Sequence, residues 1–282
     1  MSKKVRNERN IEDYSGKDEI THAYDIPDTF IGSCKPQDFE TDVLNLETLK
    51  FEKEKLNIPN GVQRVFLEIL SNAGDNTDAS RRAKVDPGDI KITMNEKTCR
   101  IENGGLHIPV KKISLVKDKG NITVKDFKED SEEWTWLPAF IFGQLRSSNN
   151  YDKNVKRMGC GRNGFGGKLT NIFSKRFVLE VYDPDTKIHF KATWKDNMFK
   201  DDEDGKPELT VIENKSITKG KVKITWNLDF KRFKMKEYSE DDLKLFKRFA
   251  VDFSFTCKIK TFFNEEELDF RHIKKYASLI WT

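Results

Sequence analysis

The sequence has few cysteines and no long apolar run, and each lack excludes a class of protein. Its four cysteines, Cys34, Cys99, Cys160 and Cys257, are far apart without a C-x-x-C pair, which favours reduced thiols over a disulfide framework or a zinc site. The longest apolar stretch, residues 134–145, contains a proline, a glycine and a glutamine and is too short to span a membrane. The N-terminus lacks the apolar core of a signal peptide, so we expect an intracellular protein with no membrane partner.

A strong excess of charge of one sign is also missing. The 51 basic residues nearly balance 47 acidic ones, which leaves a net charge of +4 over 282 residues. That balance permits contact with nucleic acid but is far from the basic surface of a dedicated DNA-binding module. Aromatic residues are plentiful, with 21 Phe and 5 Trp, which argues against a disordered polyampholyte. The length suggests one large domain or two small ones.

Hydrophobic periodicity predicts helices mainly in the first part of the chain and antiparallel strands in the last. Helices are expected within residues 20–33, 62–76, 137–146, 168–175, 241–255 and 269–280. Strands are expected within residues 90–101 (two strands around a turn), 177–182, 187–194, 209–213, 221–228 and 258–263. Residues 34–60 are polar and are assigned no element, and the Lys/Asp-rich residues 111–133 are interpreted as a solvated insertion. The expected fold class is an α/β (α+β) two-layer sandwich.

The predicted helix over residues 62–76 carries a polar stripe on an otherwise apolar surface. The members of the stripe share one face of a 3.6-residue period: Glu68, Asn72, Asp75 and Asn76. A helix that is apolar on its other sides is normally buried, so the stripe faces either a polar pocket or solvent. The helix alone leaves these two alternatives even. In the first case a ligand, metal or water-filled pocket is implied, because a buried unpaired carboxylate is costly.

A glycine-rich segment precedes the predicted helix over residues 168–175. Its glycines spell G-x-G-x-x-G, but the preceding residues 149–157 are too polar for the strand that a dinucleotide-binding fold requires. The P-loop pattern also fails, because Arg162 and Leu169 occupy its glycine and Ser/Thr positions. Five glycines within residues 159–167, directly before Lys168 and an apolar helix, nevertheless favour a phosphate-binding loop over a plain turn.

A third polar segment, residues 103–109, follows a predicted strand and contains Asn103, Gly105 and His107. A strand-end asparagine beside glycines can reach a base edge or a ribose, but the segment taken alone favours an ordinary strand–helix connection. The carboxylate run at residues 201–204 lacks the alternating ligands of a calcium loop and is interpreted as a solvated turn. The four histidines share no metal-binding spacing.

Taken in order, these segments resemble the motifs of the GHKL ATPases, a superfamily of gyrases, heat-shock chaperones, histidine kinases and mismatch-repair proteins. Within it, the chain is most similar to type IIA DNA topoisomerases of the eukaryotic and large-DNA-virus type, from about residue 11 to residue 270. The segments that carry the resemblance are residues 27–33 (PDTFIGS), 68–76 (EILSNAGDN), 138–145 (PAFIFGQL), 147–152 (SSNNYD), 161–169 (GRNGFGGKL), 171–174 (NIFS) and 192–198 (ATWKDNM).

The resemblance implies a domain layout and a fold. Residues 1–19 would form an N-terminal arm, and residues 20–270 a GHKL (Bergerat) ATP-binding domain with residues 111–133 as an insertion. Residues 271–282 would begin a transducer domain that is truncated or absent. The implied architecture is a mixed, mostly antiparallel sheet with helices on one face.

The resemblance also implies a role for individual residues. Glu68 would be the general base that activates the water attacking the γ-phosphate, and Asn72 would be the Mg²⁺ ligand. Asn103 would contact the adenine, and Tyr14 would reach the nucleotide of the partner protomer. The triphosphate would be wrapped by Gly161, Arg162, Asn163, Gly164, Phe165, Gly166, Gly167 and Lys168. Further nucleotide contacts would come from Asp75, Asn76, Gly105, Ile108, Ser147, Ser148 and Asn149.

The implied function is ATP binding that closes a dimeric clamp on double-stranded DNA, followed by hydrolysis that resets it. Its partners would be a second protomer and the transducer and cleavage-core domains, in the nucleus of a cell or at a cytoplasmic viral replication site. Two features depart from the family. His107 replaces a glycine, and no glutamine is followed two residues later by the lysine of the transducer switch. We therefore expect weak turnover and no DNA cleavage, with a non-catalytic interaction or dimerisation module as the alternative.

Overall fold

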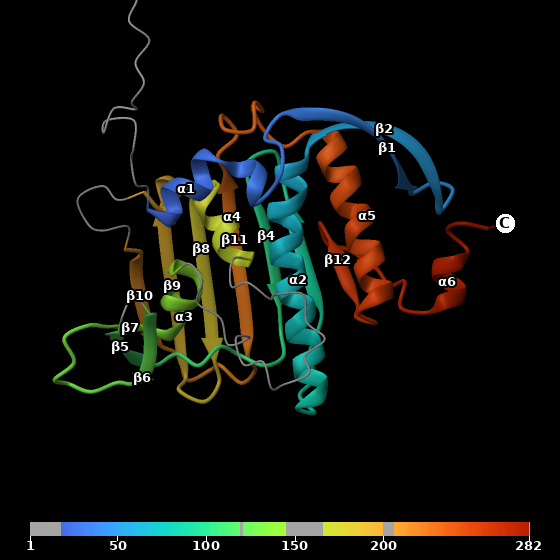
Figure 1. Cartoon of the computed structure of the whole chain (residues 1–282). Coiled ribbons are helices and arrows are strands. Elements are labelled where there is room, and N and C mark those ends of the chain that lie inside the picture. The colour runs from blue at the N-terminus through green and yellow to red at the C-terminus, as the bar shows by residue number, and fades with distance from the viewer. Residues whose placement is uncertain (1–17, 119–120, 145–165, 200–205, 282) are drawn as a thin grey trace, which may run out of the picture.

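The computed structural model describes residues 18–118, 121–144, 166–199 and 206–281 (Figure 1). A sheet of eight strands runs in the order β10-β9-β8-β11-β4-β3-β12-β13. All neighbouring strands are antiparallel except β12 and β3, which pair in parallel. These strands are β3 (Ile90–Met94), β4 (Cys99–Asn103), β8 (Ser174–Asp183), β9 (Ile188–Lys195), β10 (Glu208–Glu213), β11 (Lys221–Leu228), β12 (Thr261–Phe263) and β13 (Glu266–Leu268).

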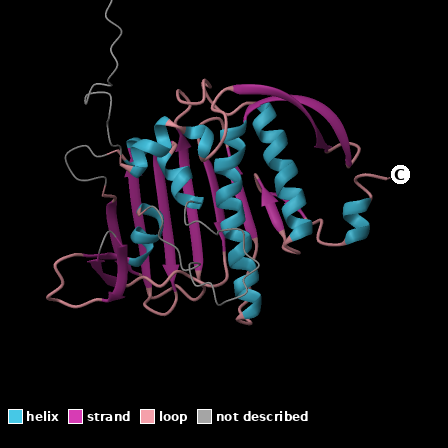
Figure 2. Ribbon diagram, in the orientation of Figure 1, coloured by secondary structure: helices cyan, strands magenta, loops and turns pink. Residues whose placement is uncertain are grey.

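Helices cover one face of this sheet, as Figure 2 shows, so the expected two-layer α/β architecture is confirmed. They are α1 (Glu19–Asp25), α2 (Asn60–Arg82), α3 (Leu137–Gly143), α4 (Gly166–Ile172) and α5 (Glu240–Thr256), with a short 3₁₀ turn at η2 (Pro27–Thr29). The main core lies between α2, α5 and the sheet. Phe66 of α2 stacks on Phe246 of α5 with ring centroids 3.9 Å apart and packs at 6.4 Å from Trp226 of β11.

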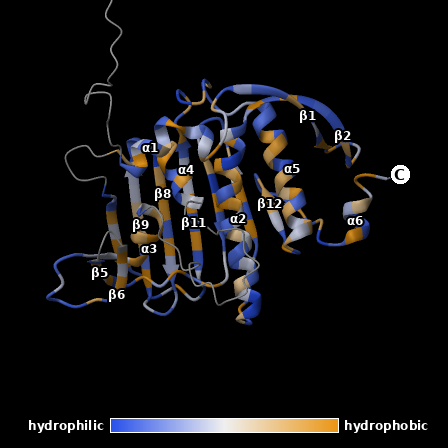
Figure 3. Cartoon of the chain, in the orientation of Figure 1, coloured by the Kyte–Doolittle hydropathy of each residue, from blue (hydrophilic) through white to orange (hydrophobic). Residues whose placement is uncertain are grey.

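Two strands form where no element was expected. β1 (Pro36–Asn45) and β2 (Lys50–Pro59) pair antiparallel over ten residues each and make a separate hairpin. The hairpin is mostly hydrophilic in Figure 3, and its buried apolar side chains are few: Val43, Leu44, Leu56 and Ile58. The assignment of residues 34–60 to no element was therefore wrong, because charged residues on both faces hid the period-two alternation.

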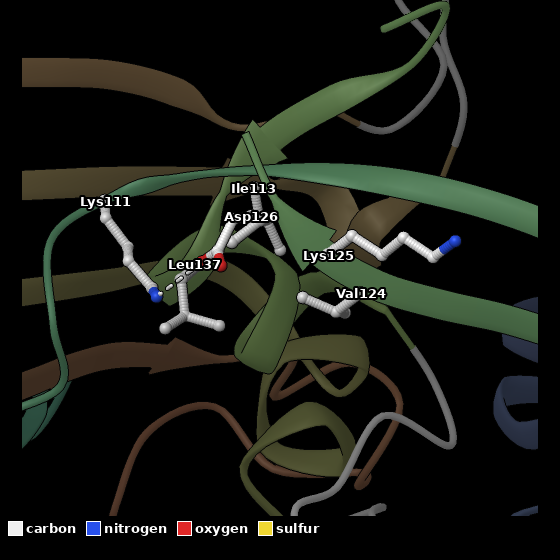
Figure 4. A pocket seen from close by; sticks show the side chains of 6 residues that line it. All are labelled: Lys111, Ile113, Val124, Lys125, Asp126 and Leu137. Carbon is white, nitrogen blue, oxygen red and sulfur yellow. Dashed lines mark hydrogen bonds and ion pairs between the residues drawn. The ribbon is translucent and has the colours of Figure 1, made fainter. Parts of the chain in front are cut away.

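The Lys/Asp-rich residues 111–133 also contain strands. β5 (Lys112–Asp118) pairs with β6 (Asn121–Asp126) and β7 (Trp134–Trp136) in a three-stranded sheet of order β6-β5-β7. A cavity of about 470 Å³ lies beside it, lined by Lys111, Ile113, Val124, Lys125, Asp126 and Leu137 (Figure 4). None of the predicted site residues lines this cavity. That the segment is an insertion stays a prediction.

The C-terminal helix is shorter than expected. The pattern predicted a helix over residues 269–280, but α6 spans only Ile273–Ala277. The chain beyond it is held by β2, because the Phe51 amide donates to the Leu279 carbonyl at 2.7 Å and the Lys50 ammonium donates to two further carbonyls there. Among the described residues, no helix is long and apolar enough to cross a membrane. The division into an arm, an ATP-binding domain and a transducer start remains a prediction.

Candidate functional site

Helix α2 places the predicted polar stripe at the edge of the core. Its apolar residues Val65, Phe66, Ile69 and Leu70 are fully buried against the sheet and α5. The four polar residues of the stripe are only half-buried: Glu68, Asn72, Asp75 and Asn76. Because a side chain facing open solvent from a surface helix would be exposed, this intermediate burial favours the pocket over the solvent-facing alternative.

The first turn of α4 lies directly against the stripe. A Cβ atom added at Gly166 would lie 2.9 Å from Glu68 Oε2 and 3.4 Å from Asn72 Oδ1. One added at Gly167 would lie 2.7 Å from the Phe142 ring and 3.4 Å from Asn72 Nδ2. A side chain at either position would have to displace these neighbours, so the two glycines permit α4 to approach the stripe closely. The structure thus brings together the Glu68 carboxylate of α2 and Gly166 at the end of the glycine-rich segment, which lie 98 residues apart in the sequence.

Glu68 has an environment suited to accepting a proton. Burial raises the pKa of its carboxyl, and the charge and hydrogen bond of Arg64 offset only part of that rise. Arg64 Nη2 lies 2.5 Å from Glu68 Oε1, one helical turn away. A carboxylate with a raised pKa is a stronger base than one in free solution, which is the property that a general base needs near neutral pH.

Lys168 supplies positive charge beside the same turn of α4. Its side chain is 4% exposed, and burial lowers the pKa of its ammonium to about 8. A buried lysine holds its proton more firmly when an anion is nearby. The side chain is therefore suited to respond to a negatively charged ligand.

The loop after β4 is fixed by α2. The Asn76 amide donates to the Gly104 carbonyl at 2.8 Å, and the Leu106 amide donates to Ser80 Oγ at 2.8 Å. Gly105 has a φ of +89°, and a Cβ there would lie 2.3 Å from Ser80 Oγ, so only glycine fits. Asn103, at the end of β4, is 8% exposed. The loop is therefore part of the same site wall as the stripe.

His107 does not need the conformation of the glycine that it replaces in the family pattern, because its φ is not positive. Its Nε2 atom lies 3.2 Å from Asp183 Oδ1 and 3.4 Å from Asp185 Oδ2, at the turn between β8 and β9. These three side chains could in principle hold a cation, a grouping that sequence spacing did not reveal. Asp183, however, already accepts hydrogen bonds from the Val110, Asp185 and Thr186 amides. The cluster is thus satisfied as a loop anchor.

Two residues that sequence reasoning missed stand in this site, Arg64 and Ser80. Both continue the stripe of α2 at four-residue spacing, before Glu68 and after Asn76, and that spacing was the available signal. Asp75 and Ile108 are half-buried. The remaining predicted site residues lie outside the described part of the chain: Tyr14, Ser147, Ser148, Asn149, Gly161, Arg162, Asn163, Gly164 and Phe165.

Comparison with curated proteins finds relatives along almost the whole chain, although no family model matches. DNA topoisomerase 2 of Plasmodium falciparum is 34% identical over 270 residues, which cover 95% of this chain and 18% of that protein. DNA topoisomerase 2 of Acanthamoeba polyphaga mimivirus is 31% identical over 284 residues, covering 99% and 20%. The chain thus spans about a fifth of the length of these relatives.

Solved structures give the same picture. The ATPase region of Saccharomyces cerevisiae topoisomerase II has a TM-score of 0.80 at 28% identity and covers 95% of this chain and 65% of that one. The ATPase and transducer domains of DNA topoisomerase II from Balamuthia mandrillaris have a TM-score of 0.82 at 26% identity, covering 97% and 65%. The fold of this chain is therefore similar to that of these ATPase regions.

Proposed function

This chain is a homologue of the ATPase region of type II DNA topoisomerases, and we propose that it binds and hydrolyses ATP between α2, α4 and the loop after β4. The observation that carries the proposal is the contact of Glu68 and Asn72 with the glycines that open α4. A half-buried carboxylate beside a glycine-rich turn supports the proposal, because one can accept a proton and the other can approach phosphate oxygens with its backbone amides.

In this proposal each wall of the pocket has its own task. Glu68 accepts a proton from the water whose oxygen attacks the γ-phosphorus, and the bond to the ADP oxygen breaks. The backbone of Gly166 and Gly167, with the Lys168 ammonium, receives the negative charge of the phosphates. Asn103 and the loop held by Asn76 and Ser80 receive the adenine. Gly161 to Phe165, Ser147, Ser148 and Asn149 would complete the phosphate and ribose contacts, and Tyr14 would act from the partner protomer.

The residues present fit a magnesium ion. Among the described residues the Asn72 side-chain amide makes no hydrogen bond, and it is half-buried beside Gly166 and Gly167. An amide oxygen is a hard ligand of the kind that Mg²⁺ accepts. Asn72 would hold the ion, which when bound neutralises charge on the phosphates.

On a larger scale, the proposed role is that of the ATP-driven gate of a type II topoisomerase. Two copies would close on double-stranded DNA when nucleotide binds, and hydrolysis would reopen them. Transducer and cleavage-core domains would complete the reaction, in a nucleus or at a viral replication site. These partners are inferred from the family resemblance alone, since a net charge of +4 is too small to indicate DNA binding by itself.

Calorimetric titration with a non-hydrolysable ATP analogue and Mg²⁺ tests the proposal on the full chain. We expect binding that depends on magnesium and is lost in Asn72→Ala, with an unchanged thermal unfolding midpoint. Absence of binding to the folded wild-type protein would overturn the proposal and favour the interaction module. The half-buried stripe and the glycines packed on it speak for the nucleotide site, because a packing module has no need of a half-buried carboxylate there.

A further inference from the structure

The two carboxylate oxygens of Glu68 have different surroundings. Oε1 receives the Arg64 guanidinium at 2.5 Å, from the preceding turn of α2. Oε2 lies on the other side, 2.9 Å from the position that a Gly166 Cβ would occupy. One oxygen is thus tied to the helix, and the other lies close to Gly166, whose Cβ position is also 3.4 Å from Asn72 Oδ1.

This division has a steric and an electrostatic reason. A glutamate side chain has three rotatable bonds, so a free one samples many positions, and a reacting group misplaced by about 1 Å can cost a hundredfold in rate. A charge-assisted hydrogen bond from arginine restricts that motion, because the guanidinium is planar and its donors are fixed. The Arg64 side chain is 57% exposed, so it approaches Glu68 from the solvent side.

We propose that Arg64 is a positioning residue for hydrolysis: it holds Glu68 Oε1 so that Oε2 alone points to the attacking water. The inference rests on the proposed function, in which Glu68 is the general base. Arg64 touches neither nucleotide nor water in this scheme, so it affects the rate of the chemical step and leaves nucleotide affinity unchanged.

The test measures single-turnover ATP hydrolysis with the full chain in excess over ATP, so that slow product release does not obscure the step. We expect Arg64→Met to lower the rate constant about ten- to a hundredfold and to leave the dissociation constant of the ATP analogue unchanged. Arg64→Lys, which retains a charged donor, should recover part of the rate. Arg82→Met, at the exposed end of the same helix, is the matched control and should hydrolyse ATP like the wild type.

A double-mutant cycle separates this inference from the function on which it rests. Glu68→Gln should lower the rate constant of hydrolysis by about 10²- to 10⁴-fold, and adding Arg64→Met to it should not lower the residual rate further, because the two residues act as one unit. A wild-type rate of hydrolysis in Glu68→Gln would overturn the proposed function itself. Loss of hydrolysis in Glu68→Gln with a wild-type rate in Arg64→Met would overturn only the positioning role. An equal loss of rate and of nucleotide affinity in Arg64→Met would also overturn it, since it would indicate a general structural defect.

Discussion

Two polar surfaces of this molecule look alike in sequence but differ in what their side chains contact. One is the stripe on α2, and the other is the face of the main sheet turned away from the helices. Along β11, residues alternate between the two faces of the sheet: Val222, Ile224 and Trp226 lie in the core, and the polar residues between them lie on the opposite face. There Glu180 is paired with Lys223 at 2.8 Å and lies 3.1 Å from both the Tyr182 hydroxyl and the His189 ring.

The comparison shows what distinguishes a candidate site from a solvated face. Glu180 has its partners on the neighbouring strands, so the sheet itself satisfies the carboxylate. Among the described residues, the partner of Glu68 is Arg64 on its own helix, and its second oxygen lies close to Gly166, whose lack of a side chain permits the approach. Polar periodicity is present on both surfaces. Of the two surfaces, α2 is the one that places a half-buried carboxylate oxygen directly against a glycine.

The largest expected effect tests this contrast directly. Glu68→Gln should lower single-turnover ATP hydrolysis by about 10²- to 10⁴-fold, the range of a lost general base. Glu180→Gln, the same change on the sheet face, should leave hydrolysis unchanged. Rapid-quench measurement of phosphate release compares the two variants. Equal losses in both would mean that the difference in surroundings has no catalytic meaning.

The next effect concerns the loop that α2 holds after β4. Gly105→Ala should lower the free energy of unfolding by about 3 kcal/mol, because alanine is strained at a φ of +89° and its Cβ would displace Ser80 Oγ from the Leu106 amide. Urea unfolding at constant pH measures the loss. The double variant Gly105→Ala with Ser80→Gly removes the clash but not the strain, so it should recover only part of the stability. Full recovery would contradict the argument from φ.

Lys168 gives a smaller effect with a defined dependence on pH. Burial lowers the pKa of its ammonium to about 8 in the folded chain, below its ordinary 10.5, so the charged form is disfavoured on folding. The resulting destabilisation is fully present below pH 8 and disappears as the pH rises from 8 to 10.5. Lys168→Met should therefore stabilise the nucleotide-free protein by about 2 kcal/mol at pH 7 and by little at pH 10.5. Chemical unfolding at both pH values measures this, with Lys231→Met as the exposed control.

Most of the fold was predictable from sequence, for a physical reason. Strand β11 alternates buried and half-buried residues, and α2 buries a stripe of apolar residues at helical spacing, so their hydrophobic periods are strong. Strands β1 and β2 bury little and carry charge on both faces, so no period marked them. The stripe on α2 was found up to Asn76, but the helix continues to Arg82 through the mostly polar residues 77–82, and Ser80 was missed with them.

The contacts of the site were less predictable than its residues. The interaction of His107 with Asp183 depends on the position of the turn between β8 and β9. The two residues are 76 positions apart, and no local sequence pattern reveals such a pair. The same holds for Gly166 and Glu68, which the resemblance placed in one site without giving their geometry. Local spacing determines helix faces, whereas the meeting of loops depends on the whole topology.

The smallest expected effect lies within the sheet face itself. Burial raises the pKa of the Glu180 carboxyl, but hydrogen bonds from Lys223, Tyr182 and His189 outweigh burial and leave the pKa below its ordinary 4.5. A depressed pKa contributes stability above pH 4.5 that is lost as the pH falls through the folded value. Glu180→Gln should thus cost about 1 kcal/mol at pH 7 and less at pH 3, measured by urea unfolding. Glu208→Gln is the matched control, because its pair with Lys195 is more exposed and should contribute at most about 0.5 kcal/mol. A larger loss for Glu208 than for Glu180 would mean that cross-strand pairing does not distinguish a satisfied carboxylate from a solvated one, and the contrast with Glu68 would then rest on the glycines alone.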